Sequence, residues 1–118
     1  MVNSRRKGKA GELEACHALN TIFDCNAHRG QQHSGTPDSP DIKHSMGGIH
    51  FEVKRCERLS VYVAMEQAIG DADNGIPAVL HRRNGKGWLV VVRLEDMEML
   101  RQVLNDWRIK QCQEGGER

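Results

Sequence analysis

The sequence predicts an α/β protein in which helices flank a mixed central sheet. Apolar residues recur at helical spacing near the N-terminus, and residues 49–55 (IHFEVKR) alternate apolar and polar side chains, as a half-buried strand does. The elements follow the order helix, strands, helix, strands, helix, which is typical of this class. With 118 residues, one domain is expected. We place it at residues 1–110, with 111–118 as a disordered tail.

The first half of the chain predicts a helix followed by a β-hairpin. The helix spans residues 8–22, a short strand covers 24–29, and the long loop 30–40 is rich in Gly, Pro, Ser and His. Residues 41–45 are expected to form a strand that turns at Gly47-Gly48 and pairs with 49–55. In the strand 49–55, His50, Glu52 and Lys54 then share one face.

The second half predicts a helix, two strands and a final helix. The first of these helices is expected at 61–73, with Ser60 as N-cap and a left-handed stop at Asn74-Gly75. The segments 77–83 and 87–93 are expected to be strands around a turn, and the second is apolar enough to be central. The last helix is expected over residues 95–107.

Charge and cysteine content exclude several classes of protein. Seventeen Lys and Arg against sixteen Asp and Glu leave a net charge of +1, so charge alone would not bind nucleic acid. The four cysteines are widely spaced, which favours reduced thiols over structural zinc. No segment approaches the roughly 20 consecutive apolar residues of a membrane span. A cytoplasmic protein with no membrane partner is expected.

The basic residues are nevertheless grouped along the chain. One group precedes the first predicted helix, a second follows the strand 49–55, and a third surrounds the turn at residues 83–86. A segregated surface of this kind suits contact with a phosphate backbone, whereas scattered solubilising charges are the alternative. The residues that we expect to contact DNA are Arg5, Arg6, Lys7, Lys9, Arg55, Arg58, Arg82 and Arg83.

Two carboxylates and a lysine converge in the predicted hairpin. Folding at Gly47-Gly48 brings Asp41 near Glu52, and Lys54 shares the face of Glu52. A pair of carboxylates makes an oxygen-rich site suited to Mg²⁺, with Mn²⁺ as an alternative. Lys54 would then position or activate a water molecule bound to the metal.

Pro40-Asp41 followed by Glu52-Val53-Lys54 resembles the motif of the PD-(D/E)XK nuclease superfamily. Together with Arg6-Lys7-Gly8, Glu12 in the first helix and the order of strands, residues 5–94 resemble the archaeal-type Holliday junction resolvases and their phage relatives. This resemblance implies a single nuclease domain with the restriction-endonuclease-like αβββαβ core.

The resemblance also implies a set of active-site residues. The helical glutamate of the family falls on Glu12, its aspartate on Asp41, and its Glu-x-Lys pair on Glu52 and Lys54. Asp41, Glu52 and the backbone carbonyl of Val53 would hold the metal, with Glu12 at the edge of the site. Gln67 falls where several branches of the superfamily carry a glutamine that faces the active site. Asp38 also follows a proline, but Asp41 is preferred because Ile42 can begin the strand.

The expected function is therefore that of a Mg²⁺-dependent DNA endonuclease, a Holliday junction resolvase active in DNA recombination and repair. A homodimer is expected because a junction presents two symmetric scissile phosphates. Gln67 suggests a second interpretation, a virus-type replication-repair nuclease that acts on flaps or nicks. A non-catalytic DNA-binding subunit is a third. His50 shares the face of Glu52, where a DNA contact or a plain surface position is favoured over a catalytic base.

Overall fold

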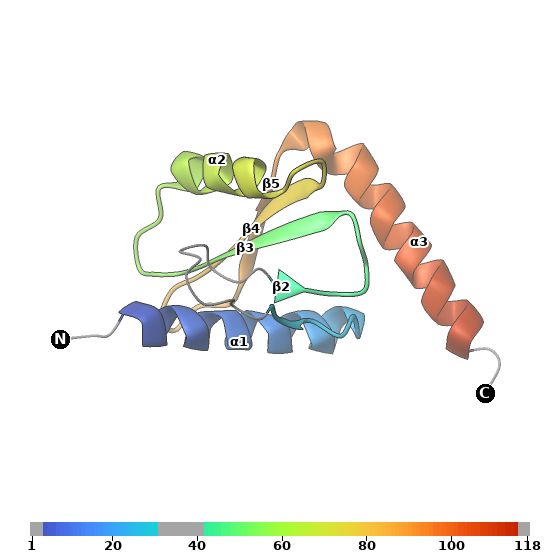
Figure 1. Cartoon of the computed structure of the whole chain (residues 1–118), viewed down its shortest axis with the longest axis horizontal. Helices are drawn as coiled ribbons and strands as arrows, with labels where there is room; N and C mark the ends of the chain where they lie inside the picture. Colours follow the sequence, from blue (N-terminus) through green and yellow to red (C-terminus); the bar gives the residue numbers. More distant parts are fainter. Residues whose placement is uncertain (1–3, 31–41, 116–118) are drawn as a thin grey trace.

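The computed structural model describes residues 4–30 and 42–115. The elements in chain order are α1 (Ser4–Phe23), β1 (His28–Arg29), β2 (Ile42–Lys43), β3 (Ile49–Arg55), α2 (Val61–Asp71), β4 (Ile76–Arg82), β5 (Leu89–Val92), the 3₁₀ turn η1 (Leu94–Asp96) and α3 (Met97–Gly115) (Figure 1). The fold is α/β, as predicted. Within the described residues, no helix is both long and apolar enough to cross a membrane.

The larger of two sheets is mixed and has the strand order β3-β4-β5. β3 runs parallel to β4, and α2 makes the crossover between them, while β5 is antiparallel to β4. In this register Glu52 lies opposite Val79, and Lys54 lies opposite His81. Since paired residues point to the same side of a sheet, the faces of β3 and β4 can be assigned together.

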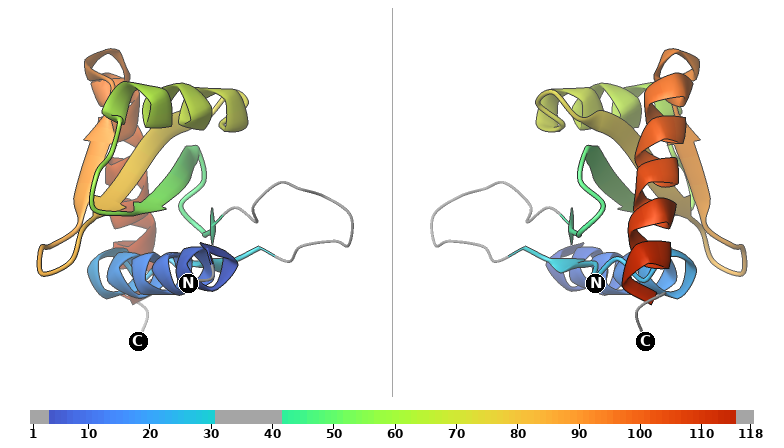
Figure 2. Two further views of the ribbon diagram at one scale, coloured as in Figure 1. Left: turned by 90° about the vertical axis from the view of Figure 1, so that its left-hand side faces the viewer. Right: turned by 90° about the vertical axis from the view of Figure 1, so that its right-hand side faces the viewer.

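Two hydrophobic clusters occupy the opposite faces of this sheet. On one face Ile49 and Phe51 pack with Cys16 and Leu19 of α1, and residues of α3 close the same cluster. On the other face Val79 packs against a buried stripe on α2 formed by Ala64, Met65 and Ala68. Figure 2 shows α1 and α2 on opposite sides of the strands. We call these sides the α1 face and the α2 face.

Helix α1 approaches β3 closely where the helix lacks a side chain. A Cβ atom at Gly11 would lie 2.7 Å from Cβ of Arg55, which is closer than such atoms approach in proteins. Gly11 therefore allows the backbones to meet at this point. The contact sets the first half of α1 against the C-terminal end of β3.

The predicted hairpin is wrong, because β2 pairs with β1 rather than with β3. The reason lies in the segment between β2 and β3, where a side chain makes hydrogen bonds to the backbone instead of the hydrogen bonds that would join two strands. Nε2 of His44 donates a hydrogen bond to the carbonyl of Ile49 (2.8 Å), and its Nδ1 accepts one from the amide of Met46 (3.2 Å). Gly47 and Gly48 both have positive φ angles, +73° and +70°, so the chain turns sharply there without forming a paired hairpin.

The segment 24–29 also differs from its prediction, since only its last two residues form a strand. Asp24 and Asn26 lie in the left-handed region, which interrupts any extended run. The side chain of Asn20 replaces the missing ladder: Oδ1 accepts from the amide of Ala27 (2.6 Å), and Nδ2 donates to its carbonyl (3.0 Å). A short strand pairing with β2 is what remains.

Helix α2 begins at the predicted residue, but its ends are formed differently. Ser60 is in the extended N-cap conformation without a capping hydrogen bond from its side chain. The left-handed residue that follows the helix is Asp73, with φ of +56°, and not Asn74 or Gly75. Asp tolerates this conformation better than most residues, so it can end a helix as glycine does.

The end of the chain differs from its prediction. Helix α3 continues to Gly115, so residues 111–115 are helical rather than a disordered tail, and 116–118 lie outside the described residues. Two side chains tie this part of α3 to the end of α1: Nε1 of Trp107 and Nε2 of Gln111 both donate to the carbonyl of Phe23, at 2.9 and 2.6 Å.

The position of the last strand in the sheet also differs from its prediction. The segment 87–93 was expected to be central, but β4 is the central strand, and β5 is at the edge.

Candidate metal-binding site

The α2 face of β3 carries the polar side chains that the alternation predicts. His50, Glu52 and Lys54 lie opposite Pro77, Val79 and His81 of β4, so all three point toward α2. The intervening Phe51 and Val53 belong to the core on the α1 face. The alternation of side chains along β3 therefore places polar residues on its α2 face and apolar residues on its α1 face.

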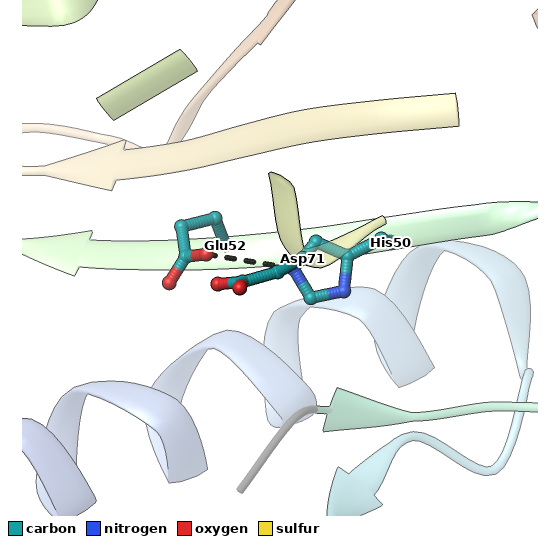
Figure 3. Close-up of side chains that lie close together, drawn as sticks. All are labelled: His50, Glu52 and Asp71. Carbon is teal, nitrogen blue, oxygen red and sulfur yellow. Dashed lines mark hydrogen bonds and ion pairs between the residues drawn. The ribbon is translucent and has the colours of Figure 1, made fainter. Parts of the chain in front are cut away.

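Three of these polar groups come together beside the end of α2. Nε2 of His50 lies 3.4 Å from Oε1 of Glu52, and their side chains are only 11% and 14% exposed. Asp71, the last residue of α2, completes the group (Figure 3). One ligand atom from each of the three side chains lies within 4.8 Å of the other two. This separation is compatible with shared coordination of one cation.

Asp71 and Glu52 form a carboxyl–carboxyl contact within this group. Loss of hydration, a hydrogen bond with Glu52 and repulsion by the Glu52 charge raise the pKa of Asp71, while His50 and Lys54 act in the opposite direction. Two carboxylates at hydrogen-bonding distance need a proton or a cation between them. A divalent cation would satisfy both oxygens without that proton.

Asp71 was not found from the sequence, although a signal was present. Gln67 and Asp71 are four residues apart in α2, so they lie on the same side of the helix. Once Gln67 was assigned to the site, that spacing also placed Asp71 beside it. The helix C-terminus is an unfavourable place for a carboxylate, which is a further indication that Asp71 has a role.

Lys54 is held by the glutamine that the resemblance singled out. Its Nζ donates a hydrogen bond of 2.7 Å to Oε1 of Gln67. The ammonium group has three donors, so two are left for a water molecule or a phosphate oxygen. Packing of Met65 and Ala68 against Val79 fixes α2 on the sheet and thereby places Gln67 above Lys54.

Glu12, which was predicted at the edge of the site, is not brought into this cluster. The carboxylate of Glu12 accepts a hydrogen bond of 2.8 Å from Nε of Arg29, and the pair is largely buried. Among the described residues, the group that could hold a metal does not include Glu12. Asp41 and Asp38 lie outside the described residues. The Val53 side chain packs on the α1 face, and its backbone lies between Glu52 and Lys54 in β3.

The predicted DNA-binding residues divide into paired and exposed groups. Arg55 and Arg82 lie on the α1 face, where both form ion pairs with Glu14. Lys9, Arg58 and Arg83 are exposed. The backbone of Arg5, Arg6 and Lys7 is helical, in the first turns of α1, but their side chains lie outside the described part of the chain.

A shallow basic pocket lies around the turn between β4 and β5. Its volume is about 510 Å³, and it is lined by His81, Arg82, Arg83, Lys86, Gly87, Trp88 and Leu89. His81 is the register partner of Lys54, so the pocket begins next to the last polar residue of the candidate site. Positive charge near an indole ring is a combination that favours contact with a nucleotide.

The cysteines take no part in the cluster. Cys16 and Cys25 are buried free thiols, and burial raises the pKa of each. Of the residues that the structure describes, no cysteine belongs to a group that could hold a metal. Cys16 and Cys25 pack as small apolar residues in the core of the α1 face.

Comparison with known proteins does not identify this chain. No family model matches it, and no curated protein or solved structure is significantly similar to it.

Proposed function

We propose that the protein is a metal-dependent DNA endonuclease that hydrolyses phosphodiester bonds in branched DNA, as a Holliday junction resolvase does. One observation carries the proposal: Glu52 and Lys54 project from the same face of β3, with Glu52 beside a second carboxylate and Lys54 fixed by Gln67. An acidic metal site next to an oriented ammonium group can support metal-assisted phosphodiester hydrolysis.

The order of elements supports a restriction-endonuclease-like core for this protein. A helix precedes the strands, β3 carries the Glu-x-Lys pair, and α2 leads to β4, which lies parallel to β3. The αβββαβ arrangement has the same sequence of elements. The separate β1–β2 ladder is the main departure from it.

The donor set at the site fits Mg²⁺ or Mn²⁺. Glu52 and Asp71 offer carboxylate oxygens, and Asp41 and the Val53 carbonyl are added by the resemblance. A bound cation would lower the pKa of its water ligand and neutralise charge on the phosphoryl group. Lys54, held by Gln67, would orient the attacking water or donate to a phosphoryl oxygen.

DNA is the proposed substrate because the protein presents exposed cations that are free to contact phosphate. Lys9, Arg58 and Arg83 are exposed, and the basic pocket at the β4–β5 turn continues the polar row of β3. The two cations paired with Glu14 are proposed to act on DNA only where that pairing leaves donors available. The cytoplasm, where DNA branches form in a bacterial or phage-infected cell, is the proposed location.

A homodimer is proposed because the edge of the sheet is apolar. On β5, Leu89 and Val90 are 63% and 58% exposed, although an edge strand normally carries charged residues. A two-fold axis beside β5 would cover this strand and present two active sites to the two scissile phosphates. A molecular mass of one chain by light scattering at tens of micromolar would contradict the dimer.

A virus-type replication-repair nuclease is the second candidate, and the Lys54–Gln67 hydrogen bond favours it. That interpretation depends on a glutamine in the active site, which not all resolvases have. The two candidates share their chemistry and differ in the DNA that they cleave. Flaps and nicks are the substrates of the second candidate.

Cleavage of labelled duplex, nicked, flap and four-way DNAs with and without Mg²⁺ tests the proposal. We expect metal-dependent cleavage of at least one branched DNA, which Glu52→Gln abolishes while DNA binding is retained or strengthened. Glu66→Gln, an exposed change on α2 beside Gln67, is the matched control and should cleave normally. Binding of branched DNA without cleavage by the unaltered protein would instead indicate a non-catalytic subunit.

A further inference from the structure

His50 occupies a position in the candidate site that the Glu-x-Lys pair does not account for. It lies two residues before Glu52 on β3 and therefore points to the same face. Its neighbour across the sheet is Pro77, whose side chain has no hydrogen-bonding group. The imidazole is 11% exposed and is directed toward Glu52, with Nε2 nearest to the carboxylate.

The distances in the cluster come close to those of a shared coordination sphere. Ligand atoms about 2.1 Å from a cation lie about 3 Å apart when adjacent and about 4.2 Å apart when opposite. The His50–Glu52 separation is 3.4 Å, and the ligand atoms of all three side chains lie within 4.8 Å of one another. Small side-chain rotations would thus bring all three onto one ion (Figure 3).

The elements that carry these ligands are held by strand pairing and by core packing. His50 and Glu52 lie within the seven-residue pairing of β3 with β4, which fixes their backbone against the central strand. Asp71 ends a helix whose Ala68 and Met65 are buried against the sheet. A site on paired strands and packed helices keeps its ligand geometry better than a loop does.

The donor set is mixed, which bears on the identity of the cation. Mg²⁺ prefers oxygen ligands and water, whereas imidazole nitrogen suits first-row transition ions. Mn²⁺ also accepts carboxylate oxygen, so a set of one imidazole and two carboxylates matches it better than Mg²⁺. We infer that His50 is a third protein ligand, beside Glu52 and Asp71, and that it makes this site select Mn²⁺ over Mg²⁺.

The inference rests on the proposed function only in placing a divalent cation at Glu52. The other role available to His50 is to pair with Glu52 and contact DNA phosphate, in which case its nitrogen would not touch the metal. The two roles differ in what is measured without DNA. Metal binding by the free protein therefore separates them.

The test is Mn²⁺ binding by the full chain, followed through the electron paramagnetic resonance signal of free Mn²⁺, with Mg²⁺ as competitor. We expect Mn²⁺ to bind at least about tenfold more tightly than Mg²⁺, and His50→Gln to weaken Mn²⁺ binding by about ten- to a hundredfold. Mg²⁺ affinity should change much less. His50→Asp, which supplies oxygen instead of nitrogen, should shift the preference back toward Mg²⁺.

Two further measurements keep the result independent of folding and of nuclease activity. Pulsed resonance of bound Mn²⁺ should show coupling to a ¹⁴N nucleus in the unaltered protein and in His17→Gln, an exposed control on α1. Absence of ¹⁴N coupling in the unaltered protein, or unchanged Mn²⁺ binding by His50→Gln, would overturn the inference. Nitrogen-coupled Mn²⁺ in a protein that cleaves none of the DNAs would leave it standing and contradict the proposed function.

Discussion

The two faces of β3 differ in almost every property, although one strand builds both. On the α2 face, His50, Glu52 and Lys54 form a polar row against the end of α2. On the α1 face, Ile49 and Phe51 are buried, and beside them lies an apolar cavity of about 230 Å³ between α1, the sheet and α3. Alternation along one strand thus places the candidate metal-binding side chains on one face and the core side chains on the other.

This comparison teaches where mutations should act. A residue on the α2 face is held by polar contacts to α2, as Lys54 is by Gln67, and little of the core depends on it. A residue on the α1 face is surrounded by apolar neighbours from α1, β4 and α3. Activity and stability should therefore respond to different faces of the same strand.

The largest expected effect is on the α2 face. Lys54→Ala removes the ammonium group proposed to orient water or phosphate, and cleavage should fall by about two to four orders of magnitude. Metal binding should persist, because the carboxylates are unchanged. The measurement is the single-turnover cleavage rate of branched DNA, with Lys43→Ala, an exposed change on β2, as control. Ordinary turnover by Lys54→Ala would make Lys54 a surface charge.

A loss of stability rather than of activity is expected one residue before Glu52, on the α1 face. Phe51 is 7% exposed in the core of the α1 face, and Phe51→Ala should lower the free energy of unfolding by about 3–5 kcal/mol. Glu52→Gln should leave stability unchanged or raise it, since it removes repulsion with Asp71. Urea denaturation of both variants makes the comparison, and equal losses would show that the faces are not separate.

Features determined by local pattern were predictable from the sequence. The alternation in IHFEVKR predicted β3 and its faces correctly, the apolar spacing predicted α1, and the Ser60 cap predicted the start of α2. These predictions succeeded because neighbours in sequence decide them. Gln67 was assigned through the resemblance instead, and the structure brings it to 2.7 Å from Lys54.

Features decided by individual side-chain hydrogen bonds were not predictable in this way. The Gly47-Gly48 pair is typical of a hairpin turn and predicted one. In the structure, the His44 ring is hydrogen-bonded to the Ile49 carbonyl and the Met46 amide, and β2 pairs with β1. The extension of α3 depends on Trp107 and Gln111, which bond to a carbonyl more than 80 residues earlier. Whether Asp41 joins the site remains a prediction.

A smaller effect is expected from the basic residues at the start of the chain. Replacing Arg5, Arg6 and Lys7 by alanine should weaken binding of all DNAs alike and flatten the slope of log K against log salt by about two to three units, at about 0.9 per phosphate contact. Fluorescence anisotropy over a salt series gives the slope, and metal affinity should not change. An unaltered slope would assign the DNA contacts to Arg58, Arg83 and the basic pocket instead.

The smallest effect concerns His44, whose side-chain hydrogen bonds close the turn before β3. Burial lowers the pKa of His44 from its usual value of 6.5, with a further contribution from the charge of nearby His50 and an opposing one from its hydrogen bond to the Ile49 carbonyl. The neutral ring is the form that accepts from the Met46 amide and donates to Ile49.

The sign of the pH dependence follows from that lowered pKa. Below about pH 6.5 the unfolded chain takes up a proton at His44 while the folded protein does not, so stability decreases as pH falls toward the folded pKa. His44→Gln should flatten the dependence of unfolding free energy on pH in this range, whereas the exposed control His17→Gln should keep it. Urea titrations of both variants at pH values from about 4.5 to about 7.5 give the two curves of unfolding free energy against pH. This range extends about two units below and one unit above 6.5. Identical slopes for His44→Gln and the unaltered protein would mean that the turn does not depend on a neutral ring, and that β3 is positioned by its ladder with β4 alone.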